Sequence, residues 1–273
     1  MDIKIVASDL DGTLLRSDLS VGEKNFSAIE NMHKAGVLFV PTTGRALDEM
    51  PDDIKNSPFI RYIITSNGAA ICDKATGKTN CIYLEQNTVE EIFKVIDKYT
   101  AMPFTHTDGK VFIEEKNQSE EAFDYYGAGK EYKEIVLKVS NSTQNLKQFI
   151  AENPTEMLVI FFKYPEEREK CFEELNQIEG ITATSSIGNN IEVIGSSVSK
   201  GEALKRLSDV TKTDIKQIMA VGDNHNDISF TKVGAFSLAT ANAVDAMKEA
   251  ADKVICSNNE SVADFIYTNF IKK

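Results

Sequence analysis

Short apolar segments that alternate with a helical pattern restrict the fold of this chain more than any other feature. Residues 3–7, 37–40, 62–64 and 218–221 have the length and composition of buried strands. Strands that alternate with helices in this way imply right-handed crossovers and a parallel sheet covered on both faces. The sequence therefore predicts an α/β fold built on a parallel sheet.

The segment between the first two predicted strands has the pattern of a helix with a defined start and end. Ser20 and Glu23 have the spacing of a capping box, in which each side chain binds a free amide of the first turn. Apolar residues at positions 26, 29 and 32 then recur at helical spacing, and Gly36 suits the left-handed residue that ends a helix. We expect a helix here that packs on the sheet.

The middle of the chain has a different order of elements and is predicted to form an inserted α/β domain. A helical pattern covers residues 89–99, strands are expected at 135–139 and 157–162, and Asp108-Gly109 predicts a hairpin turn. The predicted boundaries are 1–83 and 188–273 for the core domain and 84–187 for the insert.

Composition and charge exclude several classes of partner. The chain carries 30 Lys and Arg against 42 Asp and Glu, a net charge of −12, which disfavours nucleic acid and anionic membrane surfaces. The longest apolar run, residues 157–162, is far shorter than the roughly 20 residues of a membrane helix, and charged residues interrupt the first segment. The four cysteines lack metal-finger spacing. We therefore expect a cytoplasmic protein with neither a nucleic-acid nor a membrane partner.

Polar and acidic residues follow each of the four predicted strands. In open α/β sheets, ligands bind beyond the carboxyl ends of the strands, so these residues are expected to share one edge of the sheet. The residues in question are Asp9 and Asp11 after the first strand, Thr43 and Gly44 after the second, Asn67 after the third, and Asp223, Asn224, Asn226 and Asp227 after the fourth.

Four of these residues are acids that require a compensating charge. Two like charges 4 Å apart repel by roughly 4 kcal/mol at an effective dielectric constant of 20, so Asp9, Asp11, Asp223 and Asp227 together favour a bound cation. Oxygen ligands without His or Cys select a hard ion, and few carboxylates with open positions suit Mg²⁺ beside a phosphate. Asp- and Gly-rich turns also occur without any function. A turn without function is less favoured here, because two such turns follow neighbouring predicted strands.

Lys200 lies in the first turn of a helix that Ser199 and Glu202 are predicted to cap. Lysine has the wrong charge for a helix start, where free amides already favour anions, so an anionic ligand would explain it. The alternative is a solvated surface lysine, and Thr43 is likewise either a phosphate ligand or a simple helix cap. An attacking acid, a proton-shuttling acid, a metal and two phosphate-binding side chains are together what phosphoryl transfer needs.

With these motifs in order, the sequence resembles the haloacid dehalogenase (HAD) superfamily of phosphatases, and its Cof-type branch in particular. The resemblance implies a Rossmann-like parallel-sheet core with a large inserted α/β cap of the IIB type, which would select the leaving group. The stretches that carry the resemblance are 9–13, 42–45, 198–201 and 222–227, with 66–68 in addition.

The resemblance also implies a role for each matching residue. Asp9 would be the nucleophile that forms an aspartyl-phosphate, and Asp11 would protonate the leaving oxygen and then activate water. Mg²⁺ would be held by the Asp9 carboxylate, the Asp11 backbone carbonyl and Asp223, with Asn224 or Asp227 nearby. The residues expected to bind the transferring phosphate are Thr43, Gly44, Lys200, Asn226 and the backbone amide of Leu10.

The leading hypothesis from the sequence is therefore an enzyme, a Mg²⁺-dependent phosphatase of small phosphorylated metabolites. Sugar phosphates are the most favoured substrates. A phosphomutase or phosphotransferase on the same scaffold is the enzymatic alternative. A receiver-like module that stores an aspartyl-phosphate is the non-enzymatic one, although such modules are about half this length and lack an acid at the position of Asp11. The sequence leaves the oligomeric state open and is compatible with a monomer.

Overall fold

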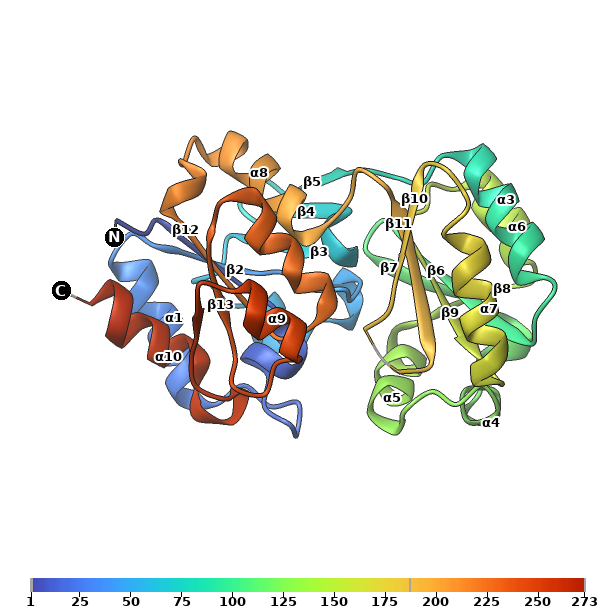
Figure 1. The fold of residues 1–273 in the computed structure, drawn as a ribbon, viewed down its shortest axis with the longest axis horizontal. Coiled ribbons are helices and arrows are strands. Elements are labelled where there is room, and N and C mark those ends of the chain that lie inside the picture. Colours follow the sequence, from blue (N-terminus) through green and yellow to red (C-terminus); the bar gives the residue numbers. More distant parts are fainter. Residues whose placement is uncertain (1, 187, 273) are drawn as a thin grey trace. The chain divides into compact units, whose positions relative to one another are not determined.

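The computed structural model describes residues 2–186 and 188–272, and the chain divides into two compact units (Figure 1). The first unit contains Met1–Thr43, Pro51–Asn80 and Ser199–Lys273, and the second contains Gly44–Met50 and Cys81–Val198.

The first unit is built on a parallel sheet with the strand order β14-β13-β12-β1-β2. Each neighbouring pair in this sheet is parallel, which confirms the predicted α/β class. All residues of β1 and β12 are buried, as expected for strands covered by helices on both faces. The strands are β1 (Ile5–Ser8), β2 (Leu38–Pro41), β12 (Ile218–Gly222), β13 (Phe236–Ala239) and β14 (Lys253–Val254).

Helices cover this sheet because alternate strand residues point to opposite faces. Leu204 and Leu207 of one helix, α8, pack in one cluster with Ile5, Ala7 and Ile218. Two further helices, α1 and α10, pack against each other although they lie near opposite ends of the chain (Figure 1). The helices of this unit are α1 (Glu23–Lys34), α2 (Asp52–Lys55), α8 (Lys200–Thr211), α9 (Asp245–Ala250) and α10 (Val262–Ile266).

The predicted capping box before α1 is wrong, although the helix itself is present. Gly22 occupies the N-cap position and makes no side-chain cap, so the helix begins at Glu23. The hydroxyl of Ser20 instead donates a hydrogen bond of 2.5 Å to Asp18 Oδ1. A local turn at Asp18 therefore competes successfully for the side chain that the sequence pattern assigned to the helix.

The third predicted strand belongs to a separate antiparallel sheet and not to the parallel one. This sheet has the order β3-β4-β5, with β3 (Tyr62–Thr65) antiparallel to β4 (Ala70–Asp73), followed by β5 (Lys78–Cys81). An isolated parallel bridge between Thr42 and Ile64 joins β3 to the end of β2. The end of β3 therefore still lies beside the end of a parallel strand.

The second unit contains a six-stranded sheet with the order β10-β11-β9-β6-β7-β8. Its strands are β6 (Ala101–Thr107), β7 (Lys110–Glu114), β8 (Asn141–Thr143), β9 (Met157–Phe162), β10 (Ile181–Thr184) and β11 (Asn190–Gly195). Its helices are α3 (Gln86–Ile96), α4 (Glu120–Tyr125), α5 (Lys130–Val139), α6 (Leu146–Glu152) and α7 (Pro165–Leu175). The predicted strand at 157–162 and the hairpin at Asp108-Gly109 are confirmed, whereas the predicted strand at 135–139 is wrong.

Two features explain the differences in this unit. Residues 135–139 lie in α5, where Lys133 and Val136 are buried three positions apart, which is the spacing of a helix face. The unit extends to Val198, beyond the predicted limit of 187, because β11 pairs with β9 and β10.

The second unit also contains a short segment that follows Thr43 in the sequence. In residues 44–50, the amide of Asp48 donates to the carbonyl of Gly109 at 2.9 Å. Glu49 Oε2 lies 3.3 Å from His106 Nε2, and both side chains are buried. These contacts attach the segment to the β6–β7 hairpin. Within the described part of the chain, none of the helices has the length and apolar character to cross a membrane.

Candidate active site

The carboxyl end of β1 places Asp9 at the edge of the parallel sheet. The Asp9 amide donates to the Val221 carbonyl at 2.9 Å, which continues the pairing with β12. The chain then turns at Gly12, where φ is +80° and a Cβ atom would lie 2.4 Å from Asp223 Oδ2. Only glycine tolerates both the left-handed backbone and this close approach. The turn thus brings the loop after β1 against the loop after β12.

The loop after β12 is folded around the buried carboxylate of Asp227. Its Oδ2 accepts hydrogen bonds from the amides of Asp223 at 2.9 Å and Asn224 at 3.0 Å. Its Oδ1 accepts a third hydrogen bond, from Lys200 Nζ at 2.7 Å. A Cβ atom at Gly222 would lie 2.3 Å from Asp227 Cγ, so glycine is required there as well. Asp227 therefore fixes both the loop and the lysine.

Lys200 is a buried cation between two carboxylates. It is the first residue of α8, and Ser199 caps that helix by accepting from the Glu202 amide at 3.1 Å. Lys200 Nζ lies 2.6 Å from Asp9 Oδ1 and 2.7 Å from Asp227 Oδ1, and the side chain is 1% exposed. The alternative of a solvated surface lysine is therefore wrong.

Three carboxylates gather at this edge and fit a cation. Asp9, Asp223 and Asp227 each offer an oxygen, and these oxygens lie within 4.8 Å of one another. Burial raises the pKa of Asp9 well above its usual value, although the charge of Lys200 acts in the opposite direction. Burial and the charge of Asp227 raise the pKa of Asp223 to about 6. Burial alone would lower the pKa of Lys200, but the charges of Asp227 and Asp9 outweigh it and raise that pKa. One lysine does not neutralise three acids, so a hard divalent cation suits this set of oxygen donors.

The other predicted residues differ in how closely they join this group. Asp11 is exposed, and its charge is near enough to contribute to the raised pKa of Asp9. Leu10 and Thr43 are buried in the first unit, whereas Gly44 belongs to the second unit. Asn226 Nδ2 donates to Asn67 Oδ1 at 3.0 Å.

Two residues in the site were present in the sequence motifs without a predicted role. Thr13 is fully buried, and its Oγ1 donates to Asp223 Oδ1 at 2.8 Å. Asn67 contacts Asn226 as described, and its amide donates to the Thr43 carbonyl at 3.0 Å. The position of each in the loop that follows a predicted strand was a visible signal, but their partners lie far away in the sequence.

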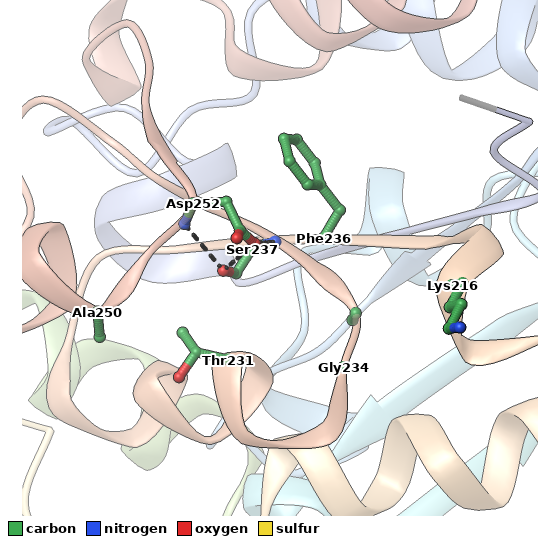
Figure 2. A pocket seen from close by; sticks show the side chains of 8 residues that line it. Lys216, Thr231, Gly234, Phe236, Ser237, Ala250 and Asp252 are labelled. Carbon is green, nitrogen blue, oxygen red and sulfur yellow. Dashed lines mark hydrogen bonds between the residues drawn. The ribbon is translucent and has the colours of Figure 1, made fainter.

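A pocket of about 350 Å³ in the first unit lies at the opposite edge of the sheet (Figure 2). It is lined by Phe236 and Ser237 at the amino end of β13, which is parallel to β12. Asp252 in this pocket accepts hydrogen bonds from the Ser237 amide at 2.7 Å and hydroxyl at 2.8 Å. Asp252 thus has a structural role at the start of the strand, away from the carboxyl ends.

The chain matches the family model of haloacid dehalogenase-like hydrolases over residues 6–266. It therefore belongs to this family, and together with its relatives this makes it a HAD-type phosphatase of the Cof branch. The membership predicted from the four motifs is confirmed.

Curated relatives and solved structures agree with this assignment. The chain is 30% identical to 5-amino-6-(5-phospho-D-ribitylamino)uracil phosphatase YwtE of Bacillus subtilis, with 97% of each chain covered. It is 22% identical to pyridoxal phosphate phosphatase YbhA of Escherichia coli, over 99% of this chain and 100% of the relative. A haloacid dehalogenase-like hydrolase from B. subtilis shares the fold with a TM-score of 0.84 at 23% identity, over 98% of this chain and 100% of that one. A HAD subclass IIB sugar phosphatase does so with a TM-score of 0.80 at 19% identity, over 97% and 96% of the two chains.

Proposed function

We propose that this phosphatase is a Mg²⁺-dependent hydrolase of small phosphomonoesters and that it acts through an aspartyl-phosphate on Asp9. Sugar phosphates are the substrates that we propose first. The observation that carries the proposal is the buried ion-pair network in which Lys200 bridges Asp9 and Asp227 beside Asp223. Such a network places a carboxylate nucleophile next to positive charge, which its approach to a phosphate dianion requires.

The proposed reaction has two displacement steps at phosphorus. In the first, a carboxylate oxygen of Asp9 forms a bond to phosphorus while the ester P–O bond breaks, and Asp11 gives its proton to the leaving oxygen. In the second, Asp11 takes a proton from water as the water oxygen attacks phosphorus, which releases Asp9 and inorganic phosphate. The exposure of Asp11 beside the buried Asp9 suits a residue that exchanges protons with substrate and water.

The metal site is proposed to consist of Asp9, Asp223 and the backbone carbonyl of Asp11, with Asn224 next to them. When bound, Mg²⁺ would neutralise charge on the phosphate oxygens and favour the ionised form of Asp9. Asp227 already accepts three hydrogen bonds, so we assign it to orienting Lys200 and the metal-binding loop.

The phosphate is proposed to bind Lys200, Thr43, Gly44, Asn226 and the Leu10 amide. The second unit is proposed to act as the cap that selects the leaving group. Relatives named for a ribityl phosphate and for pyridoxal phosphate support small phosphorylated metabolites as the substrate class.

The test is hydrolysis by the purified protein with Mg²⁺. We expect turnover of p-nitrophenyl phosphate and of members of a panel that contains sugar phosphates, 5-amino-6-(5-phospho-D-ribitylamino)uracil, pyridoxal phosphate and nucleotides. Asp9→Asn should abolish turnover, and Asp11→Asn should slow it by orders of magnitude. Absence of any hydrolysis across the panel would refute the proposal, and phosphate moved to a second sugar position instead of to water would favour the mutase.

A further inference from the structure

We propose that Asn67 is a positioning residue for the phosphate-binding groups, an inference that rests on the proposed function. Asn67 lies in the turn directly after β3, and none of the roles argued above includes it. The geometry places this one turn against three segments that are proposed to bind phosphate, and each of those segments comes from a different part of the chain.

The turn has an unusual backbone for its residue types. Ser66, Asn67 and Gly68 have consecutive positive φ values of 50°, 53° and 99°. All three residues are buried. Residues with a Cβ atom adopt this left-handed conformation at a cost in energy, and such costs are concentrated at functional sites where surrounding contacts fix the backbone.

The first two contacts of the turn involve Asn67 itself. Its amide donates to the Thr43 carbonyl at 3.0 Å, so it holds the backbone of a proposed phosphate ligand. Its side-chain oxygen accepts from Asn226 Nδ2, also at 3.0 Å, and the Asn67 side chain is 1% exposed. This partly buried contact fixes the direction of the Asn226 amide group, whose terminal torsion otherwise has two roughly equivalent orientations.

The third contact is made by Gly68 and concerns the start of α8. A Cβ atom at Gly68 would lie 2.3 Å from the carbonyl oxygen of Ser199, so the two backbones approach closely. Ser199 caps the helix, and Lys200 is its first residue. The turn therefore packs against the backbone that carries the lysine, in addition to holding Thr43 and Asn226.

These three contacts imply a common function for the turn. Binding and transfer of a phosphoryl group depend on placing several donors to within about 0.5 Å, and residues behind the site supply that precision. A buried turn in the left-handed conformation, in contact with all three segments, keeps their spacing constant. Asn67 is the member whose side chain acts directly on a proposed phosphate ligand.

Glycine provides a clean substitution at this position. Asn67→Gly keeps the left-handed backbone, which glycine adopts freely, and removes the side-chain amide whose oxygen accepts from Asn226. Lys212→Gly is the matched control, because Lys212 is an exposed residue with φ of 55° at the end of α8. The control makes the same kind of change in the same unit without touching the site.

The experiment compares the wild type, Asn67→Gly, Asn226→Ala, the double variant and Lys212→Gly. With Mg²⁺ and p-nitrophenyl phosphate, we expect Asn67→Gly to raise KM and the inhibition constant of inorganic phosphate about tenfold, with a smaller change in kcat. The melting temperature should stay close to that of the wild type. The double variant should be no worse than Asn226→Ala alone, since both changes remove the same contact. Lys212→Gly should match the wild type in every constant.

Two results would overturn the inference. One is an Asn67→Gly variant with wild-type KM and phosphate inhibition, and the other is a double variant in which the two losses multiply. If the wild type hydrolyses no ester, the proposed function fails separately. The rise in melting temperature on adding tungstate, a phosphate mimic, then decides the matter, and equal rises in the wild type and Asn67→Gly would contradict the positioning role.

Discussion

Replacing Lys200 with Met tests the charge balance of the site directly. Lys200 Nζ lies 2.6 and 2.7 Å from carboxylate oxygens of Asp9 and Asp227, and all three side chains are buried. At an effective dielectric constant of 20, each contact is worth about 6 kcal/mol of Coulomb attraction before the cost of burying the charges is subtracted. Removing one partner of a buried pair typically costs about 3–5 kcal/mol, because the remaining charge is left uncompensated. We expect a loss of this size from Lys200→Met.

The loss should also depend on pH in a defined direction. Burial raises the pKa of Asp9, and Lys200 is the group that lowers it, so the variant raises this pKa further. A carboxyl group whose pKa is higher in the folded than in the unfolded protein destabilises the fold as pH rises through the interval between the two values. The loss of unfolding free energy caused by Lys200→Met should therefore be larger at pH 8 than at pH 5. The difference is about 1.4 kcal/mol for each unit by which the substitution raises the pKa of Asp9 within this pH range.

The assay is thermal unfolding without added metal at pH 5 and pH 8. A loss of 3–5 kcal/mol corresponds to a fall of about 6–20 °C in the melting temperature for a domain of this size. Lys205→Met is the control, since Lys205 lies on the same helix and forms an exposed pair with Glu202 at 2.7 Å, worth about 1 kcal/mol or less. A Lys200→Met protein that melts like the control, or whose deficit does not change with pH, would refute the reasoning.

Three further predictions concern other parts of the molecule. Gly12→Ala should destabilise the protein by about 1–2 kcal/mol from the left-handed backbone alone, which thermal melting measures. It should also lower kcat at least tenfold in steady-state kinetics, because the new methyl group displaces Asp223. Mg²⁺ should raise the melting temperature of the wild type, and Asp223→Asn should lose most of that rise; an unchanged rise would exclude Asp223 from the metal site. Burial lowers the pKa of His106 to about 3, so the unfolded protein binds a proton there more readily than the folded one. The free energy of unfolding should therefore fall by about 2 kcal/mol between pH 6.5 and pH 5 through this group. His106→Asn should reduce this pH dependence in urea unfolding.

The sequence predicts the site better than it predicts the surrounding elements, for a physical reason. Asp9 and Asp223 follow buried strands, and adjacent parallel strands bring their carboxyl ends to one edge whatever the intervening chain does. The helix at residues 130–139 was predicted in part as a strand, because a short apolar run does not distinguish the two periods until its burial is known.

Contacts between side chains distant in sequence were beyond prediction from one chain. The hydrogen bonds from Thr13 to Asp223 and from Asn226 to Asn67 depend on rotamers that only the packed structure defines. The membership of β3 in an antiparallel sheet likewise depends on its pairing with β4, which follows a turn that the apolar pattern does not reveal. Sequence patterns locate strand ends well, and they leave the partners of individual side chains undetermined.

The short segment after Thr43 sets a condition on exchanging domains between related enzymes. A chimera that transplants residues 81–198 as a block would leave behind residues 44–50, which contact the β6–β7 hairpin through Asp48 and Glu49. The buried Glu49 would then face a foreign residue in place of His106. A functional graft must carry both stretches, so the smallest exchangeable module of this protein is discontinuous in sequence.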